Sequence, residues 1–340
     1  MPNWIGDLVM ATPILADLKK KFPLAHITAL SSIPGSDLLQ NNPYVDTICS
    51  FHKPSNLKRR TLNREIIEKL KKEKYDIGIL LTHSFSSAWW FFKGGVKKRI
   101  GYRGNFRSFL LTHPLSFPLG KETHHLVTTY KYLLSALDIA PSTTSPAIFT
   151  TDQEIQETRS FLQNLGIGRE DIVVGINPGA AYGSAKCWLP ERFQEVTEAL
   201  ITQKNIKILY FGNQSTSSLV ESICTSFPKD RVLNLSGKTT IRQLACLIHV
   251  CHLLLTNDSG PMHMAAALNT PLIALFGSTN DTVTGPFLYQ GKVIHKHVFC
   301  SPCYQRKCPL DFRCMKQISS AEVLEEIKAI LSKTRCYEPI

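Results

Sequence analysis

The chain has 340 residues, 43% of them hydrophobic, and carries a formal net charge of +12. This length accommodates two domains of ordinary size, and no apolar run approaches the ~18 residues that a membrane-spanning helix requires. The N-terminus has no basic-then-apolar signal segment, and the ten cysteines are scattered rather than arranged as a small disulfide framework. We therefore expect mostly reduced cysteines and a cytoplasmic protein without a transmembrane helix.

The positive charge is concentrated in the first half of the chain. Residues 1–150 hold 20 Lys and Arg against 10 Asp and Glu, whereas residues 151–340 hold 19 against 17. Such a basic region attracts an anionic partner, for example a membrane surface, a phosphorylated lipid or nucleic acid. No nucleic-acid-binding module accompanies the charge, so we expect no nucleic acid partner. A solvated basic surface without any partner is the alternative.

The chain begins with a loop-like segment at the place where a doubly wound sheet has its first strand. Residues 3–7, NWIGD, have the composition of a loop that follows a strand, yet only two residues precede them. Either the chain starts after this strand, or the fold lacks it. We expect a helix over residues 8–18, where Asp7 is either a general base that faces a ligand or an N-cap of the helix.

Short apolar strands alternate with amphipathic helices along both halves of the chain. The expected helices are 11–22, 63–74, 126–137, 152–165, 191–203, 217–227, 262–268 and 320–332. The expected strands are 27–30, 77–81, 173–176, 207–211, 253–255 and 272–276. This alternation predicts an α/β protein with two Rossmann-like parallel-sheet domains that face a cleft.

A boundary between these domains is expected near PSTTSP at residues 141–146, because prolines and small polar residues interrupt helices and strands. We place the domains at 1–145 and 146–340. The last helix, 320–332, is a candidate for packing back on the first domain.

Three polar segments follow strands of the second half. They are NPGAAYGSAK (177–186), FGNQ (211–214) and TNDSGP (256–261). Open α/β sheets bind ligands at the carboxyl ends of their strands, and helix N-termini present free N–H groups to phosphates. We therefore expect a nucleotide or sugar-phosphate site here.

The candidate donor-binding residues combine small residues, which let the backbone approach a phosphate, with polar and charged side chains. They are Gly179, Ala181, Lys186, Gly212, Gln214, Asp258, Ser259, Gly260 and His263. Each segment alone is also compatible with an ordinary strand-to-helix loop, and the Lys186 segment lacks P-loop spacing. His263 is either a phosphate contact or a packed histidine at a helix start.

A basic segment with neighbouring aromatics lies in the first half. Residues 97–107 contain five basic side chains beside the aromatic run 89–92. Arginine forks suit phosphate and carboxylate groups, so this stretch is a candidate for binding an acceptor. The aromatics belong either to the core or to a membrane anchor.

Four cysteines form a compact cluster near the C-terminus. Cys300, Cys303, Cys308 and Cys314 follow the pattern C-x2-C-x4-C-x5-C. Four thiolates can hold a zinc ion or an iron–sulfur cluster, although the spacing is not that of a zinc ribbon. A structural metal, a disulfide or redox role, and free thiols are all left open by the spacing.

The segments NWIGD, PGAAYGSAKCW and NDSGPMHMAAALNTPLIALFG resemble those of the heptosyltransferases of lipopolysaccharide core assembly, in the same order along nearly the whole chain. This family, GT9, has the GT-B fold and comprises inverting glycosyltransferases. The resemblance is strongest to members that add the second heptose. It implies an ADP-L-glycero-D-manno-heptose donor, a heptosyl-Kdo2-lipid A acceptor and a peripheral location at the cytoplasmic face of the inner membrane.

The resemblance also implies roles for individual residues. Asp7 is the implied general base, Lys186 neutralises the diphosphate, and Asp258 holds the heptose hydroxyls. The backbone N–H groups of Ser259 and Gly260 are implied phosphate contacts. The residues expected to bind the acceptor are Trp4, Arg99, Arg103 and Arg107.

The donor segments contain no pair of carboxylates of the kind that binds a catalytic metal. We therefore expect that no cofactor is required. A structural metal at the four cysteines stays possible from the sequence. The alternatives to this function are a GT9-type enzyme with another sugar donor or lipid-linked acceptor, a non-catalytic nucleotide-sugar-binding paralogue, and a sugar-nucleotide epimerase or phosphorylase of the same fold.

Overall fold

A computed structural model describes residues 1–52, 59–118, 120, 123–288 and 291–334. The chain separates into two compact units, Met1–Ala147 and Ile148–Ile340. The boundary expected after residue 145 lies two residues before this division. None of the helices in the described ranges is both long and apolar enough to cross a membrane.

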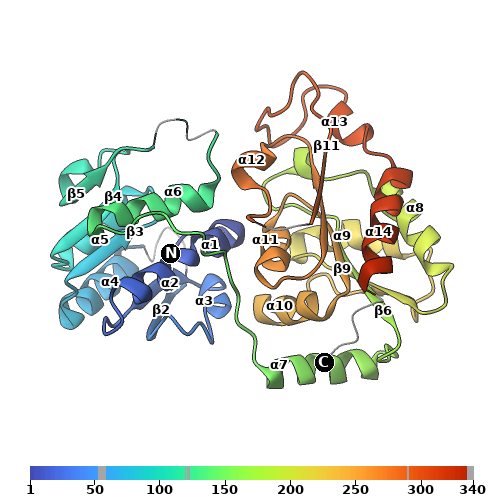
Figure 1. Cartoon of the computed structure of the whole chain (residues 1–340), viewed down its shortest axis with the longest axis horizontal. Coiled ribbons are helices and arrows are strands. Elements are labelled where there is room, and N and C mark those ends of the chain that lie inside the picture. The colour runs from blue at the N-terminus through green and yellow to red at the C-terminus, as the bar shows by residue number, and fades with distance from the viewer. Residues whose placement is uncertain (53–58, 119, 121–122, 289–290, 335–340) are drawn as a thin grey trace. The chain divides into compact units, whose positions relative to one another are not determined.

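The first unit contains two parallel sheets rather than one continuous sheet (Figure 1). Its strands are β1 (Thr28–Ser32), β2 (Thr47–Phe51), β3 (Ile77–Leu80), β4 (Lys98–Tyr102) and β5 (His113–Leu115). Its helices are α1 (Ile5–Ala11), α2 (Pro13–Lys21), α3 (Gly35–Leu38), α4 (Arg59–Glu73), α5 (Phe85–Lys93) and α6 (Leu126–Tyr132), with short 3-10 turns η2 (Ser108–Leu110) and η3 (Leu133–Leu137). β1 pairs with β2, and β3-β4-β5 forms the other sheet.

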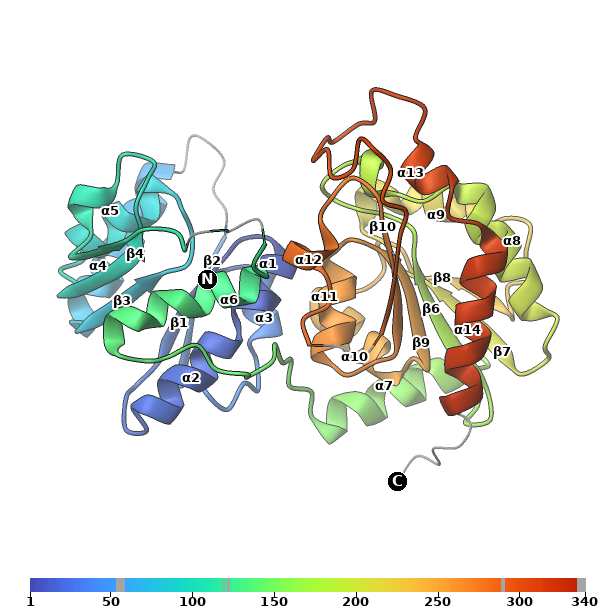
Figure 2. The ribbon, with the colours of Figure 1, turned by 45° about the horizontal axis from the view of Figure 1, so that its top comes forward.

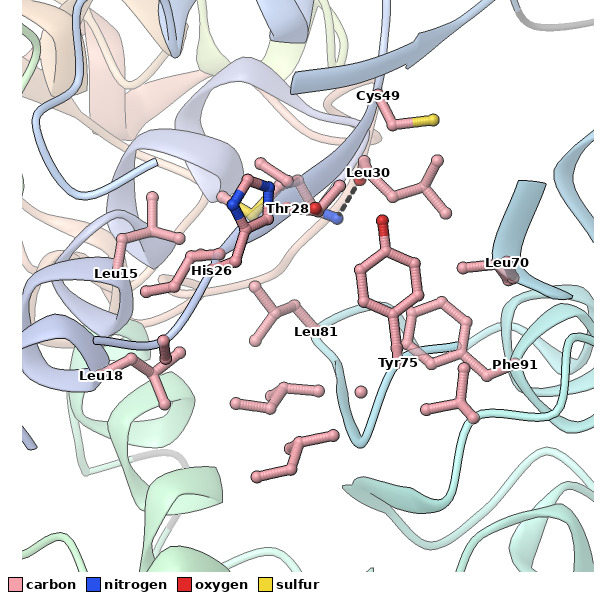
Figure 3. A pocket seen from close by; sticks show the side chains of 18 of the residues that line it. Leu15, Leu18, His26, Thr28, Leu30, Cys49, Leu70, Tyr75, Leu81 and Phe91 are labelled. Atoms are coloured by element: carbon pink, nitrogen blue, oxygen red, sulfur yellow. Dashed lines mark hydrogen bonds between the residues drawn. The ribbon is translucent and has the colours of Figure 1, made fainter. Parts of the chain in front are cut away.

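An apolar cavity of about 200 Å³ is bordered by both β1 and β3. Figure 3 shows Leu30, Tyr75, Leu81 and Phe91 around this space. In the described ranges, no strand lies between β1 and β3 and forms hydrogen bonds to both. This matches the expected lack of a strand in this domain. The backbone nitrogen of Met1 reaches the edge of β1, where it donates to the carbonyl of Leu30 at 2.6 Å.

The expected single helix near the start is two helices. Thr12 separates α1 from α2, and Pro13 occupies the first turn of α2. Proline has no N–H to donate to the preceding turn, so a continuous helix through this position is disfavoured. The Thr12 hydroxyl donates to the carbonyl of Val9 at 2.8 Å, which closes the end of α1.

The segment expected to be a linker is bound to the first unit. The carboxylate of Asp17, which is buried in α2, accepts hydrogen bonds from the hydroxyls of Ser142 and Thr144 at 2.8 Å. The ammonium of Lys131 donates to the carbonyls of the same two residues at 2.8 and 2.6 Å. These contacts explain why the division falls after the segment rather than within it.

The second unit is built on one six-stranded parallel sheet with the order β11-β10-β9-β6-β7-β8. The strands are β6 (Ile172–Asn177), β7 (Ile206–Tyr210), β8 (Val232–Asn234), β9 (Leu253–Asn257), β10 (Leu272–Phe276) and β11 (Lys292–His295). Every residue of β6, β9 and β10 is buried, as expected for central strands covered by helices on both faces.

Helices cover both faces of this sheet (Figure 2). They are α7 (Asp152–Asn164), α8 (Pro190–Ile201), α9 (Ser217–Cys224), α10 (Ile241–Val250), α11 (Gly260–Ala267), α12 (Asp281–Thr284), α13 (Arg313–Lys316) and α14 (Ser320–Thr334), with 3-10 turns η4 (Ser184–Lys186) and η5 (Gln214–Thr216). α14 packs on α8, β9 and β10, and its Val323, Ile327 and Leu331 join the core. The apolar face of this last helix is thus used within the second unit, and packing of the helix on the first unit stays a prediction.

Candidate functional site

The polar segments expected to bind a ligand meet at the carboxyl edge of the second sheet. β6 lies between β9 and β7, so the segments that follow these three strands are neighbours in space. The chain proceeds from β6 toward β7 and β8 on one side, and later from β9 toward β10 and β11 on the other. The boundary between β6 and β9 is therefore the topological switch point, where open α/β sheets bind their ligands.

Lys186 and Asp258 face each other across this switch point. Lys186 ends η4 after β6, and Asp258 follows β9 directly. Nζ of Lys186 donates to Oδ2 of Asp258 at 2.5 Å, with side-chain exposures of 13% and 4%. The same Oδ2 accepts the hydroxyl of Thr279 at 2.5 Å. The pair places a cation and an anion side by side in a largely desolvated position, where charges act strongly on a bound ligand.

Two buried asparagines hold the loops of this site in place. Nδ2 of Asn177 donates to the carbonyl of Gly179 at 2.9 Å and to Oγ of Ser259 at 3.1 Å. Nδ2 of Asn257 donates to the carbonyl of Pro178 at 2.7 Å, and its Oδ1 accepts from the backbone of Trp188 at 3.0 Å. The loops after β6 and β9 are therefore cross-linked by amide side chains at the ends of the two strands.

These asparagines and Thr279 were not among the residues selected from the sequence. Asn177 and Asn257 are the last residues of otherwise apolar strands, and Thr279 follows β10. A polar residue at the carboxyl end of a buried strand is the signal that points to them.

The remaining donor-site residues surround this pair. Ser259 is the N-cap of α11, and Gly260 is its first residue, so both lie where helix N–H groups lack intrahelical partners. His263 lies one turn further on and is buried at 6% exposure. This burial favours the alternative in which His263 is a packed histidine at the start of the helix.

Gly179 and Gly212 both lie against Thr216. A Cβ at Gly179 would approach Cγ2 of Thr216 to 2.8 Å, and a Cβ at Gly212 would approach its Oγ1 to 2.7 Å. Both glycines therefore let the loops after β6 and β7 pack closely. Gln214 and Ala181 are exposed on the same loops, and their expected roles in donor binding stay predictions.

Asp7 lies in the first unit, as the third residue of α1. The N-cap of α1 is Trp4, so the alternative of an N-capping aspartate is wrong. Asp7 is half-buried. The pKa of Tyr130 on α6 is raised well above its ordinary value. Burial is the larger cause, and the nearby carboxylate of Asp7 adds to it. Asp7 therefore stands beside a phenol in a partly desolvated position, and its role as a base stays a prediction.

The expected acceptor residues separate into buried and exposed groups. Arg107 is 0% exposed, and its guanidinium donates to the carbonyls of Tyr102 and Thr82. Burial lowers the pKa of Arg107 to about 10. A guanidinium enclosed by backbone carbonyls supports the loop after β4, which corrects its assignment as an acceptor contact.

The Arg99 side chain also forms hydrogen bonds to the backbone. Its Nε donates to the carbonyl of Leu110 at 2.7 Å, and the guanidinium lies 5.4 Å from the ring of Phe92. Arg103 and Trp4 are exposed, so these two residues remain candidates for contact with an acceptor.

Among the described residues of the second unit, two groups of side chains could hold a metal. The first is the cysteine cluster, whose four members line one cavity. The second is Asp281, His295 and His297, whose ligand atoms lie within 4.8 Å of one another. In the second group, Nδ1 of His295 lies 2.9 Å from Asp281 and Nε2 lies 2.9 Å from Oγ of Ser301. Both ring nitrogens of His295 are thus already engaged within the protein.

The sequence matches the model of "Glycosyltransferase family 9 (heptosyltransferase)" over residues 63–312. It is 29% identical to lipooligosaccharide heptosyltransferase 2 of Campylobacter jejuni, over 97% of each chain. It is 30% identical to lipooligosaccharide heptosyltransferase 2 of Haemophilus ducreyi, over 86% of each chain.

The structure is similar to that of ADP-heptose lipopolysaccharide heptosyltransferase II of Escherichia coli. The TM-score is 0.84 and the sequence identity 27%, with 98% of each chain covered. The similarity therefore extends over both units.

Proposed function

The chain belongs to glycosyltransferase family 9, the heptosyltransferases, and from this premise we propose that it transfers heptose from ADP-heptose to the inner core of lipopolysaccharide. Relatives named heptosyltransferase 2 match nearly the whole chain. They do not favour the alternatives of another sugar donor, a non-catalytic binding protein or an epimerase. As in the expected reaction, the acceptor is the heptosyl-Kdo2-lipid A core.

The observation that carries the proposal is the Lys186–Asp258 pair at the switch point of the second sheet. A nucleotide-sugar donor brings a diphosphate, which needs a cation, and a sugar, whose hydroxyls suit a carboxylate. Lys186 supplies the cation, and its three N–H donors allow it to contact both Asp258 and a phosphate. The first turn of α11, beginning at Ser259 and Gly260, adds backbone N–H groups for the phosphates.

The proposed chemistry is a single displacement with inversion at the anomeric carbon. Asp7 accepts the proton of the acceptor hydroxyl while that oxygen attacks the anomeric carbon of heptose. The bond to the ADP oxygen breaks, and negative charge develops on the diphosphate. Lys186 and the α11 N-terminus stabilise that charge, so they lower the barrier more than they strengthen ground-state binding.

The basic charge of the first half supports an anionic acceptor at a membrane surface. Residues 1–150 carry twice as many basic as acidic side chains, 20 against 10. Lipid A and Kdo are anionic, so this charge attracts the acceptor and the lipids around it. We place the enzyme at the cytoplasmic face of the inner membrane, without an inserted helix.

A donor and acceptor screen tests this proposal. The full chain is incubated with ADP-heptose or UDP-glucose and with either Kdo2-lipid A or heptosyl-Kdo2-lipid A, and the lipid products are measured by mass spectrometry. We expect addition of one heptose to heptosyl-Kdo2-lipid A from ADP-heptose alone. Transfer from UDP-glucose, or donor binding without transfer to either acceptor, would contradict the proposal.

A further inference from the structure

Four cysteines line a single cavity in the second unit. Cys300, Cys303, Cys308 and Cys314 surround a space of about 180 Å³. None of the four forms a disulfide. Sets of four thiolates are the usual ligands of structural zinc ions and of iron–sulfur clusters. The fold thus brings the four cysteines together around one cavity, which their spacing in the sequence alone did not establish.

The same cavity contains a buried hydroxyl without a partner. Ser278 lines the cavity and is 1% exposed. Its Oγ has no hydrogen-bond partner among the residues that the structure describes. Buried polar groups are almost always satisfied, so this hydroxyl calls for an acceptor in the cavity. The ligand sulfurs of a metal centre accept such hydrogen bonds from surrounding groups.

Apolar packing holds the cysteine segment mainly near its two ends, where Val298 and Phe312 contact the core. Residues 296–312, between β11 and α13, contain no helix or strand. Connections of this length within a compact domain are uncommon unless they serve a function. Three of its large apolar side chains, Phe299, Tyr304 and Leu310, are 79%, 49% and 56% exposed. Between its ends the segment is held by single hydrogen bonds, such as the one that the backbone N–H of Tyr304 donates to the carbonyl of Ser278 at 2.7 Å. Metal ligation would add to the interactions that offset the entropy of ordering this segment.

The cysteine segment contacts the loop that carries Lys186. The backbone N–H of Ala185 donates to the carbonyl of Arg306 at 3.1 Å, and the hydroxyl of Tyr182 donates to the carbonyl of Tyr304 at 2.8 Å. A Cβ at Gly183 would lie 2.2 Å from the carbonyl oxygen of Arg306. The two segments are therefore in direct backbone contact, so the position of one constrains the other.

We propose that Cys300, Cys303, Cys308 and Cys314 bind a metal centre through four thiolates, and that this centre fixes the segment 299–312 against the loop that carries Lys186. The shared chemistry is thiolate ligation, which a zinc ion or an iron–sulfur cluster satisfies. In the described ranges no three cysteine sulfurs lie within 4.8 Å of one another. Tetrahedral zinc with Zn–S bonds of ~2.3 Å holds its sulfurs ~3.8 Å apart, so binding of a single zinc would draw these thiolates closer together. An iron–sulfur cluster is larger and would bind to more widely spaced sulfurs.

Elemental analysis of the full chain, purified without oxygen, tests the site directly. Zinc, iron and acid-labile sulfide are measured together with the number of thiols. We expect either about one zinc per chain, or iron and sulfide in equal amounts with the visible absorption of an iron–sulfur cluster. Either result supports thiolate ligation and identifies the metal. Metal far below one equivalent, with the thiols of all four of these cysteines titratable or with disulfides among them, overturns the proposal.

Matched serine variants separate this site from cysteines elsewhere. Cys303→Ser and Cys308→Ser remove one ligand each, and we expect the bound metal to fall at least severalfold. Cys224→Ser is the control, because Cys224 is a half-buried cysteine on α9 outside the cavity, and it should retain the full metal content. If the ligand variants do not fold, metal removal from the wild-type chain by a chelator, followed by re-binding of cobalt, provides the test. The spectrum of cobalt bound to thiolates supports the site, and its absence overturns it.

Hydrogen exchange tests the second half of the proposal. Amide exchange of residues 179–187 is compared in the metal-loaded chain and after chelation, without any donor. We expect faster exchange in this loop and in 299–312 after metal removal, while α10 stays unchanged as an internal control. Unchanged exchange in 179–187 would contradict the coupling to Lys186 even if the metal is present, and this result is independent of catalytic activity.

Discussion

Lys186 and Asp258 form a buried ion pair, Nζ to Oδ2 at 2.5 Å, that joins the loop after β6 to the loop after β9. Each partner alone would be a desolvated charge, and Asp258 without Lys186 would still accept the hydroxyl of Thr279. Removing one member of such a pair typically costs about 3 kcal/mol or more, whereas removing both costs less than the sum. The pair therefore contributes to the shape of the donor site as well as to its charge.

This pair predicts strong coupling in a double-mutant cycle. Lys186→Met and Asp258→Asn should each lower the melting temperature of the second unit, while the double variant should lose less than the two single losses added together, by at least ~1 kcal/mol. Calorimetry on the wild type, both single variants and the double variant gives the free energies of unfolding for this cycle. Additive losses, within about 0.5 kcal/mol, would show that the two side chains are not coupled.

Arg107 is predicted to act on stability and not on acceptor binding. Its buried guanidinium donates to the carbonyls of Tyr102 and Thr82, so Arg107→Met removes these hydrogen bonds and should destabilise the first unit by about 3 kcal/mol. The exposed Arg103→Met is the matched control and should change stability by less than about 0.5 kcal/mol. A normal melting temperature for Arg107→Met together with a raised acceptor KM would restore the binding role.

The sequence predicted the second unit more closely than the first. The strand expected at 272–276 has the bounds of β10, because central parallel strands are continuous apolar runs. β2 was missed, since TICSF is an edge strand with a half-exposed pattern. α10 was also missed, although the capping box of Thr240 and Gln243 marks its start. Side-chain roles were harder to predict, because the burial of Arg107 depends on a loop that folds over it.

The ion pair between Glu154 on α7 and Arg242 on α10 predicts that the protein loses stability in acid. Hydrogen bonds from the Arg242 guanidinium, with smaller contributions from Thr151, lower the pKa of Glu154 from 4.5 to about 2. A depressed carboxyl pKa stabilises the fold above the unfolded-state value, and this stabilisation is lost as the pH falls from about 4.5 toward 2. Glu154→Gln, which imitates the protonated acid, should therefore cost about 1–2 kcal/mol near neutral pH and progressively less below pH 4.5.

Melting curves of the wild type and Glu154→Gln across this pH range check the prediction. Glu157→Gln, an exposed position on the same helix, is the control and should behave like the wild type. A stability difference for Glu154→Gln that is the same at pH 7 and pH 3 would exclude this carboxylate as the cause.

Asp7 should affect the rate of transfer and not donor binding. Asp7→Asn keeps the size of the side chain but cannot accept the proton, so kcat should fall roughly 100-fold or more, while the affinity for ADP should change less than twofold. Asp37→Asn is a matched control, because Asp37 is a half-buried aspartate in the first turn of α3 in the same unit. A kcat for Asp7→Asn close to that of Asp37→Asn would remove Asp7 from the mechanism.

In the proposed transfer of heptose, Lys186 stabilises the departing ADP. The most direct measurement is the rate of heptose transfer from ADP-heptose to heptosyl-Kdo2-lipid A by the wild type, Lys186→Met and the exposed control Lys204→Met. We expect transfer by the wild type and by Lys204→Met, and a loss of roughly 100-fold or more in kcat for a folded Lys186→Met. A Lys186→Met enzyme that transfers heptose at the wild-type rate would exclude this role for Lys186.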